Sequence, residues 1–187
     1  MIKAKLNIAF WLIVTTQLFS NELYAQGIYK SKEGILSVMA IQFGEPVTAH
    51  SKEVEVSLDY ETSDIILILD PFTLHTGIDS LDRKLKELTI RFVFKGNLNL
   101  GQVATTTHTP QSFQFNGTLE TPQNRKVEIK GVGRLEHIGG GEGLAGELAL
   151  YFDTDARNLG LHSAGELPRD QHLVKVQFFE TVLRKTY

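Results

Sequence analysis

Apolar and polar residues alternate along most of this chain with a period of two. Between residues 53 and 60 every second side chain is apolar, and Glu, Ser or Asp stands between them. Such alternation predicts a β-strand with one face against apolar contents and the other in water. Residues 35–43 and 65–69 are more evenly apolar and are also predicted strands. The alternation returns in residues 88–94, 113–119, 127–129, 148–152 and 174–178.

Short polar segments separate these strands. Helical spacing occurs at Ile78, Leu81 and Leu85, where Asp79 or Ser80 is the predicted N-cap. A further single turn is predicted at residues 154–159. Residues 116–117, Asn-Gly, would suit a hairpin turn, but the strand returning from it would be too short. We therefore predict a bulge there, inside a longer strand.

About eight strands of seven to nine residues, linked mostly by short turns, predict an all-β fold. A single antiparallel up-and-down barrel with one or two short helices fits best, because closure removes the exposed sheet edges. A sandwich of immunoglobulin type is the alternative. It would be expected to have a tryptophan in its core, and the single Trp of this chain is Trp11, close to the start.

The first 25 residues have the pattern of a secretory signal peptide. Lys3 and Lys5 precede an apolar run at residues 8–14, and Ala25 supplies a small residue at the expected cleavage position. Gln17 interrupts the apolar segment, which is shorter than the roughly 20 residues of a spanning helix. We therefore predict a signal peptide at residues 1–25 and one domain at residues 26–187, with an uncleaved anchor as the alternative.

Composition restricts the functions that are open to the chain. Its 187 residues are 42% hydrophobic, carry a formal net charge of −3 and include no cysteine. This excludes a disordered or collagen-like protein, and the charge does not favour nucleic-acid binding. An exported protein without disulfides depends on packing and strand pairing alone. Export to a bacterial periplasm is the localisation that we expect.

The short motifs in the chain do not point to catalysis. Residues 141–146 match G-x-G-x-x-G, but they lie late in an all-β chain rather than in a βαβ unit. Asp153 opens a weak likeness to a calcium loop, better interpreted as a cap at Asp153 or Thr154. The six histidines are dispersed, and no G-x-S-x-G nucleophile motif occurs. We predict no catalytic residue, no metal site and no required cofactor.

The order of these segments resembles the YceI-like family, exported bacterial proteins with a lipocalin-like barrel. The resemblance rests on the strand pair at residues 51–70, the helix with Leu81 and Leu85, and the segments 109–119, 130–135 and 172–184. Where the resemblance leads us to expect Ile after Leu135, this chain has His137. The resemblance implies a divergent member that binds an isoprenoid or similar long amphiphile inside its barrel.

An eight-stranded barrel is either filled by its own side chains or holds one small ligand. The residues alone leave both open, and the resemblance favours a cavity. We predict a non-enzymatic carrier whose partner is an amphiphilic lipid, with peripheral membrane contact compatible with that role. A filled barrel that binds another protein and, less favoured, a barrel enzyme acting on a lipid are the alternatives. The predicted ligand-binding residues are Phe92, Phe94, Phe113, Phe115, Leu150, Phe152, Val176 and Phe178.

Overall fold

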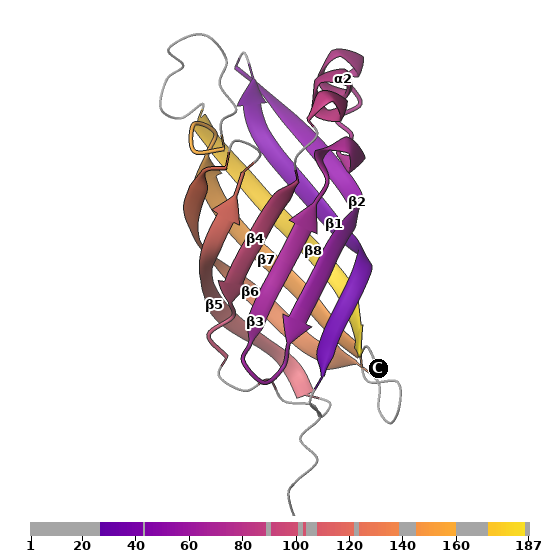
Figure 1. Ribbon diagram of the computed structural model, residues 1–187, viewed down its shortest axis with the longest axis vertical. Coiled ribbons are helices and arrows are strands. Elements are labelled where there is room, and N and C mark those ends of the chain that lie inside the picture. The colour runs from indigo at the N-terminus through magenta and orange to yellow at the C-terminus, as the bar shows by residue number, and fades with distance from the viewer. Residues whose placement is uncertain are drawn as a thin grey trace, which may run out of the picture.

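The computed structural model shows eight antiparallel strands that close into one barrel (Figure 1). It describes residues 27–42, 44–88, 91–100, 103, 108–121, 124–138, 145–159 and 172–185. The predicted signal peptide and residues 141–144 of the glycine motif lie outside these ranges. The elements are β1 (Ile28–Gln42), β2 (Glu45–Asp59), β3 (Asp64–Leu69), η1 (Pro71–Thr73), α2 (Asp79–Glu87), β4 (Phe92–Asn97), β5 (His108–Glu120), β6 (Lys126–Ile138), β7 (Ala145–Asp155) and β8 (Leu173–Lys185).

Each strand pairs with the next, and β1 closes the barrel by pairing with β8. The all-β barrel with short helices is therefore confirmed. Six of the strands are longer than the predicted seven to nine residues, and β3 and β4 have only six each. Leu88 is not in a strand but is the C-cap of α2, because the connection from β3 to β4 runs through both helices.

The alternation determines which side chains enter the barrel. Along β2 the residues Val54, Val56 and Leu58 are buried, and Tyr60 just beyond the strand is buried too. They belong to one apolar cluster that all eight strands enclose. The predicted phase of this strand is therefore correct.

The predicted bulge at Asn116 and Gly117 is wrong. Both residues pair in regular register with β4 on one side and β6 on the other, and the irregularity of β5 lies between His108 and Gln111. Close packing explains why glycine stands at position 117. A Cβ atom there would lie 2.7 Å from Cζ of Phe94 and 2.6 Å from the Cα atom of Gly96. The missing side chain therefore makes room for the Phe94 ring and for close approach of β4.

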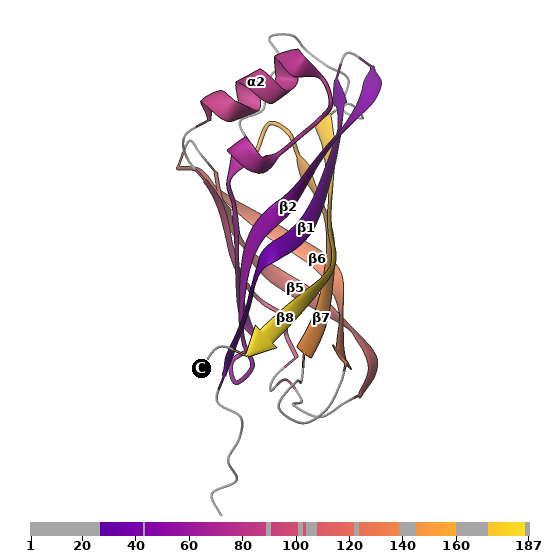
Figure 2. The ribbon, with the colours of Figure 1, turned by 90° about the vertical axis from the view of Figure 1, so that its right-hand side faces the viewer.

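Helix α2 and η1 lie at one end of the barrel, across the ends of the strands (Figure 2). An isolated antiparallel bridge joins β2 to the segment that follows η1. In it the backbones of His50 and His75 exchange hydrogen bonds of 2.9 Å. The ends of β1 and β8 that pair at Tyr29 and Lys185 lie at the opposite end. The barrel thus has a helix end and a terminal end.

Candidate functional site

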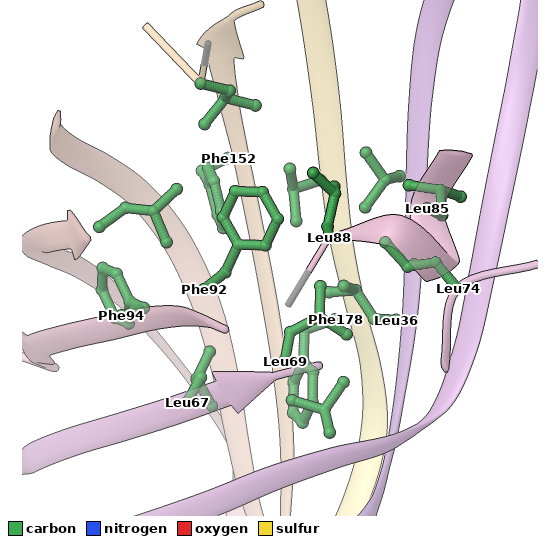
Figure 3. A pocket seen from close by; sticks show the side chains of 15 residues that line it. Leu36, Leu67, Leu69, Leu74, Leu85, Leu88, Phe92, Phe94, Phe152 and Phe178 are labelled. Atoms are coloured by element: carbon green, nitrogen blue, oxygen red, sulfur yellow. The ribbon is translucent and has the colours of Figure 1, made fainter. Parts of the chain in front are cut away.

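An apolar cavity of about 150 Å³ lies in the half of the barrel nearest the helices (Figure 3). Strands β1 to β5, β7 and β8 supply most of its walls, the segment around α2 supplies three leucines, and the turn after β7 supplies Leu159. Among the residues that the structure describes, every lining side chain is leucine, valine or phenylalanine. The lining residues are Leu36, Val38, Val54, Leu67, Leu69, Leu74, Leu85, Leu88, Phe92, Phe94, Leu119, Phe152, Leu159, Val176 and Phe178.

The strand register places the wall residues opposite one another. Leu67 pairs with Phe94, and Leu69 pairs with Phe92, across β3 and β4. On the other side of the barrel, Val176 of β8 pairs with both Val38 of β1 and Phe152 of β7. Paired residues point to the same face of a sheet, so each pair adds two apolar side chains to one layer of the wall.

Helix α2 covers the cavity with a leucine face. Leu85 and Leu88 line the cavity from the helix, together with Leu74 from the segment that follows η1. In Figure 3 Leu74 and Leu85 lie on the side opposite Phe92 and Phe94, and Leu88 lies between them. A short helix with one apolar face gains stability from packing that face against a core.

The start of α2 differs from the predicted cap. Its N-cap is Ile78, which has no capping side chain, so neither Asp79 nor Ser80 caps the helix. Asp82 instead reaches back and accepts hydrogen bonds from the backbone N–H and the hydroxyl of Thr76. These bonds, chiefly the one from the hydroxyl, lower the pKa of Asp82. The carboxylate thus ties the helix to the segment that precedes it.

A second predicted cap is also replaced. Residues 156–159 form the expected turn, but Asp155, and neither Asp153 nor Thr154, accepts from the backbone N–H of Arg157. The Arg157 side chain also hydrogen-bonds Asp155 and holds the pKa of that carboxyl at about 2. This turn carries Leu159 to the edge of the cavity.

Aromatic rings form the floor of the cavity. Phe94 and Phe152 line it, and Phe115 lies behind them, with its ring edge-on to both at centroid distances of 5.7 and 6.2 Å. The Phe115 ring rests against Gly131 of β6, where a Cβ atom would be 2.5 Å from Cζ. Edge-to-face packing of this kind is the favoured geometry for aromatic pairs.

The other half of the barrel, toward the terminal end, contains a buried polar pair. Nε2 of His137 lies 2.9 Å from the hydroxyl oxygen of Tyr60, and the ring of Tyr29 stacks on Tyr60 at 3.8 Å. His137 is only 1% exposed. Burial, with a smaller contribution from Tyr29, raises the pKa of Tyr60 above its ordinary value of 10.0. His137 is therefore a core residue.

We expect this pair to make the protein sensitive to alkali. In the unfolded chain Tyr60 ionises near pH 10.0, whereas in the folded chain it stays protonated to higher pH. The unfolded state therefore gains stability as the pH rises above about 10, and the free energy of unfolding falls. Tyr60→Phe should remove this part of the pH dependence and lower stability at neutral pH by about 1–3 kcal/mol, because the buried hydrogen bond between Tyr60 and His137 is lost. Urea unfolding between pH 7 and 11 measures both effects.

The control is Tyr151→Phe, on the outer wall of β7, where 41% of the side chain is exposed. This variant keeps Tyr60 and should retain the alkaline loss of the wild-type protein. If Tyr60→Phe and the wild type lose stability equally above pH 10, another group causes the loss.

The eight predicted ligand-binding residues divide into two sets. Phe92, Phe94, Phe152, Val176 and Phe178 line the cavity. Phe113, Phe115 and Leu150 are buried in the same apolar cluster but do not line it. All eight belong to this cluster or pack against it, and whether they bind a ligand stays a prediction.

Sequence reasoning missed the leucines and valines of β1 to β3 and the three leucines around α2. Leu36, Val38, Leu67 and Leu69 belong to strands that were recognised as such, but the prediction favoured strands rich in phenylalanine. Leu85 was recognised on the apolar face of the helix. The signal that could have placed it in the site is that such a face needs a partner, and the barrel offers one.

The lining formed by the described residues presents an apolar surface that suits apolar groups. None of the fifteen lining residues carries an ionisable side chain. Within the described residues, no three His, Asp or Glu side chains gather as metal ligands would. In the same part of the chain, no helix has the length and apolar character needed to cross a bilayer.

Two solved structures share the architecture of this chain. A polyisoprenoid-binding domain from Saccharophagus degradans, implicated in plant cell wall breakdown, matches with a TM-score of 0.63 at 13% identity, over 84% of this chain and 97% of that one. BcnA from Burkholderia cenocepacia matches with a TM-score of 0.50 at 10% identity, over 80% of this chain and 94% of that one. The chain has their fold. It therefore has the fold that its resemblance to the YceI-like family implies.

Comparison of sequences adds nothing to this likeness in fold. No protein-family model matches the chain. No curated protein is similar enough in sequence to be recognised as a relative.

Proposed function

We propose that this protein binds the apolar tail of an isoprenoid or similar amphiphile in the cavity beneath α2, as a carrier and not as an enzyme. The observation that carries the proposal is the lining itself, fifteen apolar side chains around about 150 Å³ of unfilled space inside a barrel. Well-packed interiors leave few such spaces. The likeness in fold to a polyisoprenoid-binding domain supports the same ligand class.

The energy of tail burial can be compared with the free energy that binding needs. Each buried CH₂ contributes roughly 0.8 kcal/mol, so one five-carbon isoprene unit contributes roughly 3–4 kcal/mol before the costs of association. Micromolar binding needs about 8 kcal/mol net. The cavity of about 150 Å³ has room for about one unit, so burial of the tail there supplies roughly half of this free energy before the costs of association.

The polar head of such a ligand would lie at the helix end of the barrel. Exposed charged residues of α2, including Arg83, Lys84 and Lys86, are present there. The resemblance of the chain to the YceI-like family supports a divergent member of that family. The predicted signal peptide at residues 1–25 supports export to the periplasm, where peripheral contact with a membrane would let the lipid enter.

Filling the cavity is the direct test. Val176 lines it from β8, between Val38 and Phe152. The phenyl ring that replaces the smaller valine side chain in Val176→Phe should occupy the space that the tail needs. We expect this variant to bind geraniol, an alcohol of two isoprene units, about tenfold or more weakly than the wild type. Isothermal titration calorimetry on the purified protein measures the difference.

The matched control makes the same substitution on the outer wall. Val132 of β6 is 54% exposed, and Val132→Phe should leave geraniol binding unchanged. Circular dichroism checks that both variants fold. Equal binding by wild type and Val176→Phe would show that the alcohol binds elsewhere. Absence of binding by the wild type would overturn the proposal.

A further inference from the structure

The cavity is short for a protein that resembles binders of long isoprenoids. Its volume of about 150 Å³ equals that of an engineered apolar cavity that holds one benzene molecule. Pockets for drug-sized ligands are typically about 300–1,000 Å³. The space therefore holds about six carbons of a tail and not a long polyisoprenoid.

The reason for the short cavity is the aromatic floor. Phe94 and Phe152 form its surface, and Phe115 lies behind them, only 2% exposed, with its ring edge-on to both. Beyond the floor the barrel is filled. Leu135, Leu148 and Leu150 have no exposed surface, and the Tyr60–His137 pair lies toward the terminal end.

The floor rings are held where they lie. Phe115 rests on Gly131, and Phe94 rests on Gly96, so each ring occupies the place of a missing side chain on the wall. If either ring swung aside, it would lose that position and the edge-on contacts together. The floor is thus a fixed layer and not a loose one.

We propose that Phe115 determines the length of tail that the cavity accepts, and that the ligand is an amphiphile with a short branched tail or one that inserts only the end of its tail. This inference depends on the proposed function, since it concerns the ligand of the same cavity. Phe115 contacts both floor rings without lining the cavity itself. It is therefore a specificity residue that acts by supporting the floor.

The test measures affinity against chain length. Linear alcohols from butanol to dodecanol are titrated into the purified protein by calorimetry. Each added CH₂ should tighten binding about fourfold while the tail still finds new apolar surface. In the wild type the affinity should rise with chain length up to a break, beyond which a longer tail does not bind more tightly. In Phe115→Ala the floor is deeper, and the break should move to a longer alcohol.

Two further variants make the result decisive. Phe115→Leu keeps more of the core and should move the break in the same direction by a smaller amount, which preserves the test if Phe115→Ala does not fold. Phe113→Ala removes a phenyl ring from the neighbouring inward position of β5, which lies farther from the cavity. Phe113 is buried, and among the described residues its ring forms no aromatic pair with Phe94 or Phe152. For Phe113→Ala the break in affinity should stay at the same alcohol length as in the wild type.

The outcomes separate this inference from the proposed function. If the wild type binds alcohols but Phe115→Leu breaks at the same length, Phe115 does not set the limit. The same conclusion follows if Phe113→Ala moves the break as far as Phe115→Ala, or if wild-type affinity rises without a break up to dodecanol. In all three results the proposed function stands. If the wild type binds no alcohol, both proposals fail.

Discussion

Gly117→Ala should lower the free energy of unfolding by about 3 kcal/mol or more, since overpacking a rigid core costs about 1–3 kcal/mol and sometimes more. The added methyl group would lie 2.6 Å from the Cα atom of Gly96 and 2.7 Å from Cζ of Phe94, and would also meet the carbonyl oxygen of Lys95. Two of these three atoms are backbone. They can move only if β4 and β5 separate, and the two strands pair on both sides of this position. Urea unfolding followed by circular dichroism measures the loss.

Gly77→Ala is the control for this substitution. Gly77 precedes α2 with φ of +75° and has no atom within 4 Å of the position of an added Cβ. The new methyl group meets no obstacle, and only the left-handed backbone conformation is penalised, by about 1–2 kcal/mol. If both alanine variants lose the same stability, close packing between β4 and β5 does not explain the cost at Gly117.

Phe178→Ala should lower the free energy of unfolding by about 3–5 kcal/mol. Phe178 has no exposed surface, pairs with Leu36 on β1 and Leu150 on β7, and rests against Gly34. Its ring also lines the cavity, so its removal enlarges a space that is already unfilled. The surrounding strands belong to a closed barrel and have little freedom to collapse inward. Denaturant unfolding at neutral pH provides the measurement.

The matched control is Phe72→Ala in η1, where 57% of the side chain is exposed. Removal of an exposed ring creates no cavity and should change stability by about 0.5 kcal/mol or less. A small loss in Phe178→Ala, comparable to that of Phe72→Ala, would mean that the barrel closes around the missing ring. It would contradict the rigid wall on which the cavity depends.

Strand phase could be predicted from the sequence because it is a local property. Side chains two positions apart share a face, so Val54, Val56 and Leu58 identify the inner face of β2 without knowledge of any other strand. The same reasoning identified Phe92, Phe94, Phe152 and Phe178 as inward residues. Closure into a barrel followed from the number of strands and the short turns between them.

The extent of the cavity could not be predicted in this way. Phe113, Phe115 and Leu150 have the same inward phase as Phe92, yet they fill the barrel while Phe92 borders a space. That difference depends on which rings meet across the interior from strands that are not neighbours, as Phe115 of β5 and Phe152 of β7 do. Alternation along one strand contains no information about such contacts.

The segment between β3 and β4 was predicted least well. A continuous strand was expected through residues 88–94, but Leu88 ends α2 and faces the cavity instead. Leucines fit a helix face and a strand face equally, and the docking of a helix over an open barrel end decides between them. Gly117 was misinterpreted for a similar reason, because the Phe94 ring that needs its space belongs to another strand.

The meeting of β1 and β8 at Tyr29 and Lys185 has a practical consequence. The start of β1 and the end of β8 lie at the rim opposite α2, so a tag or surface linker attached to either one is directed away from the leucine-covered opening (Figure 2). Immobilised protein should therefore remain accessible to dissolved ligand. The same proximity suits circular permutation, in which a short peptide joins the two ends and new termini are cut in an exposed hairpin.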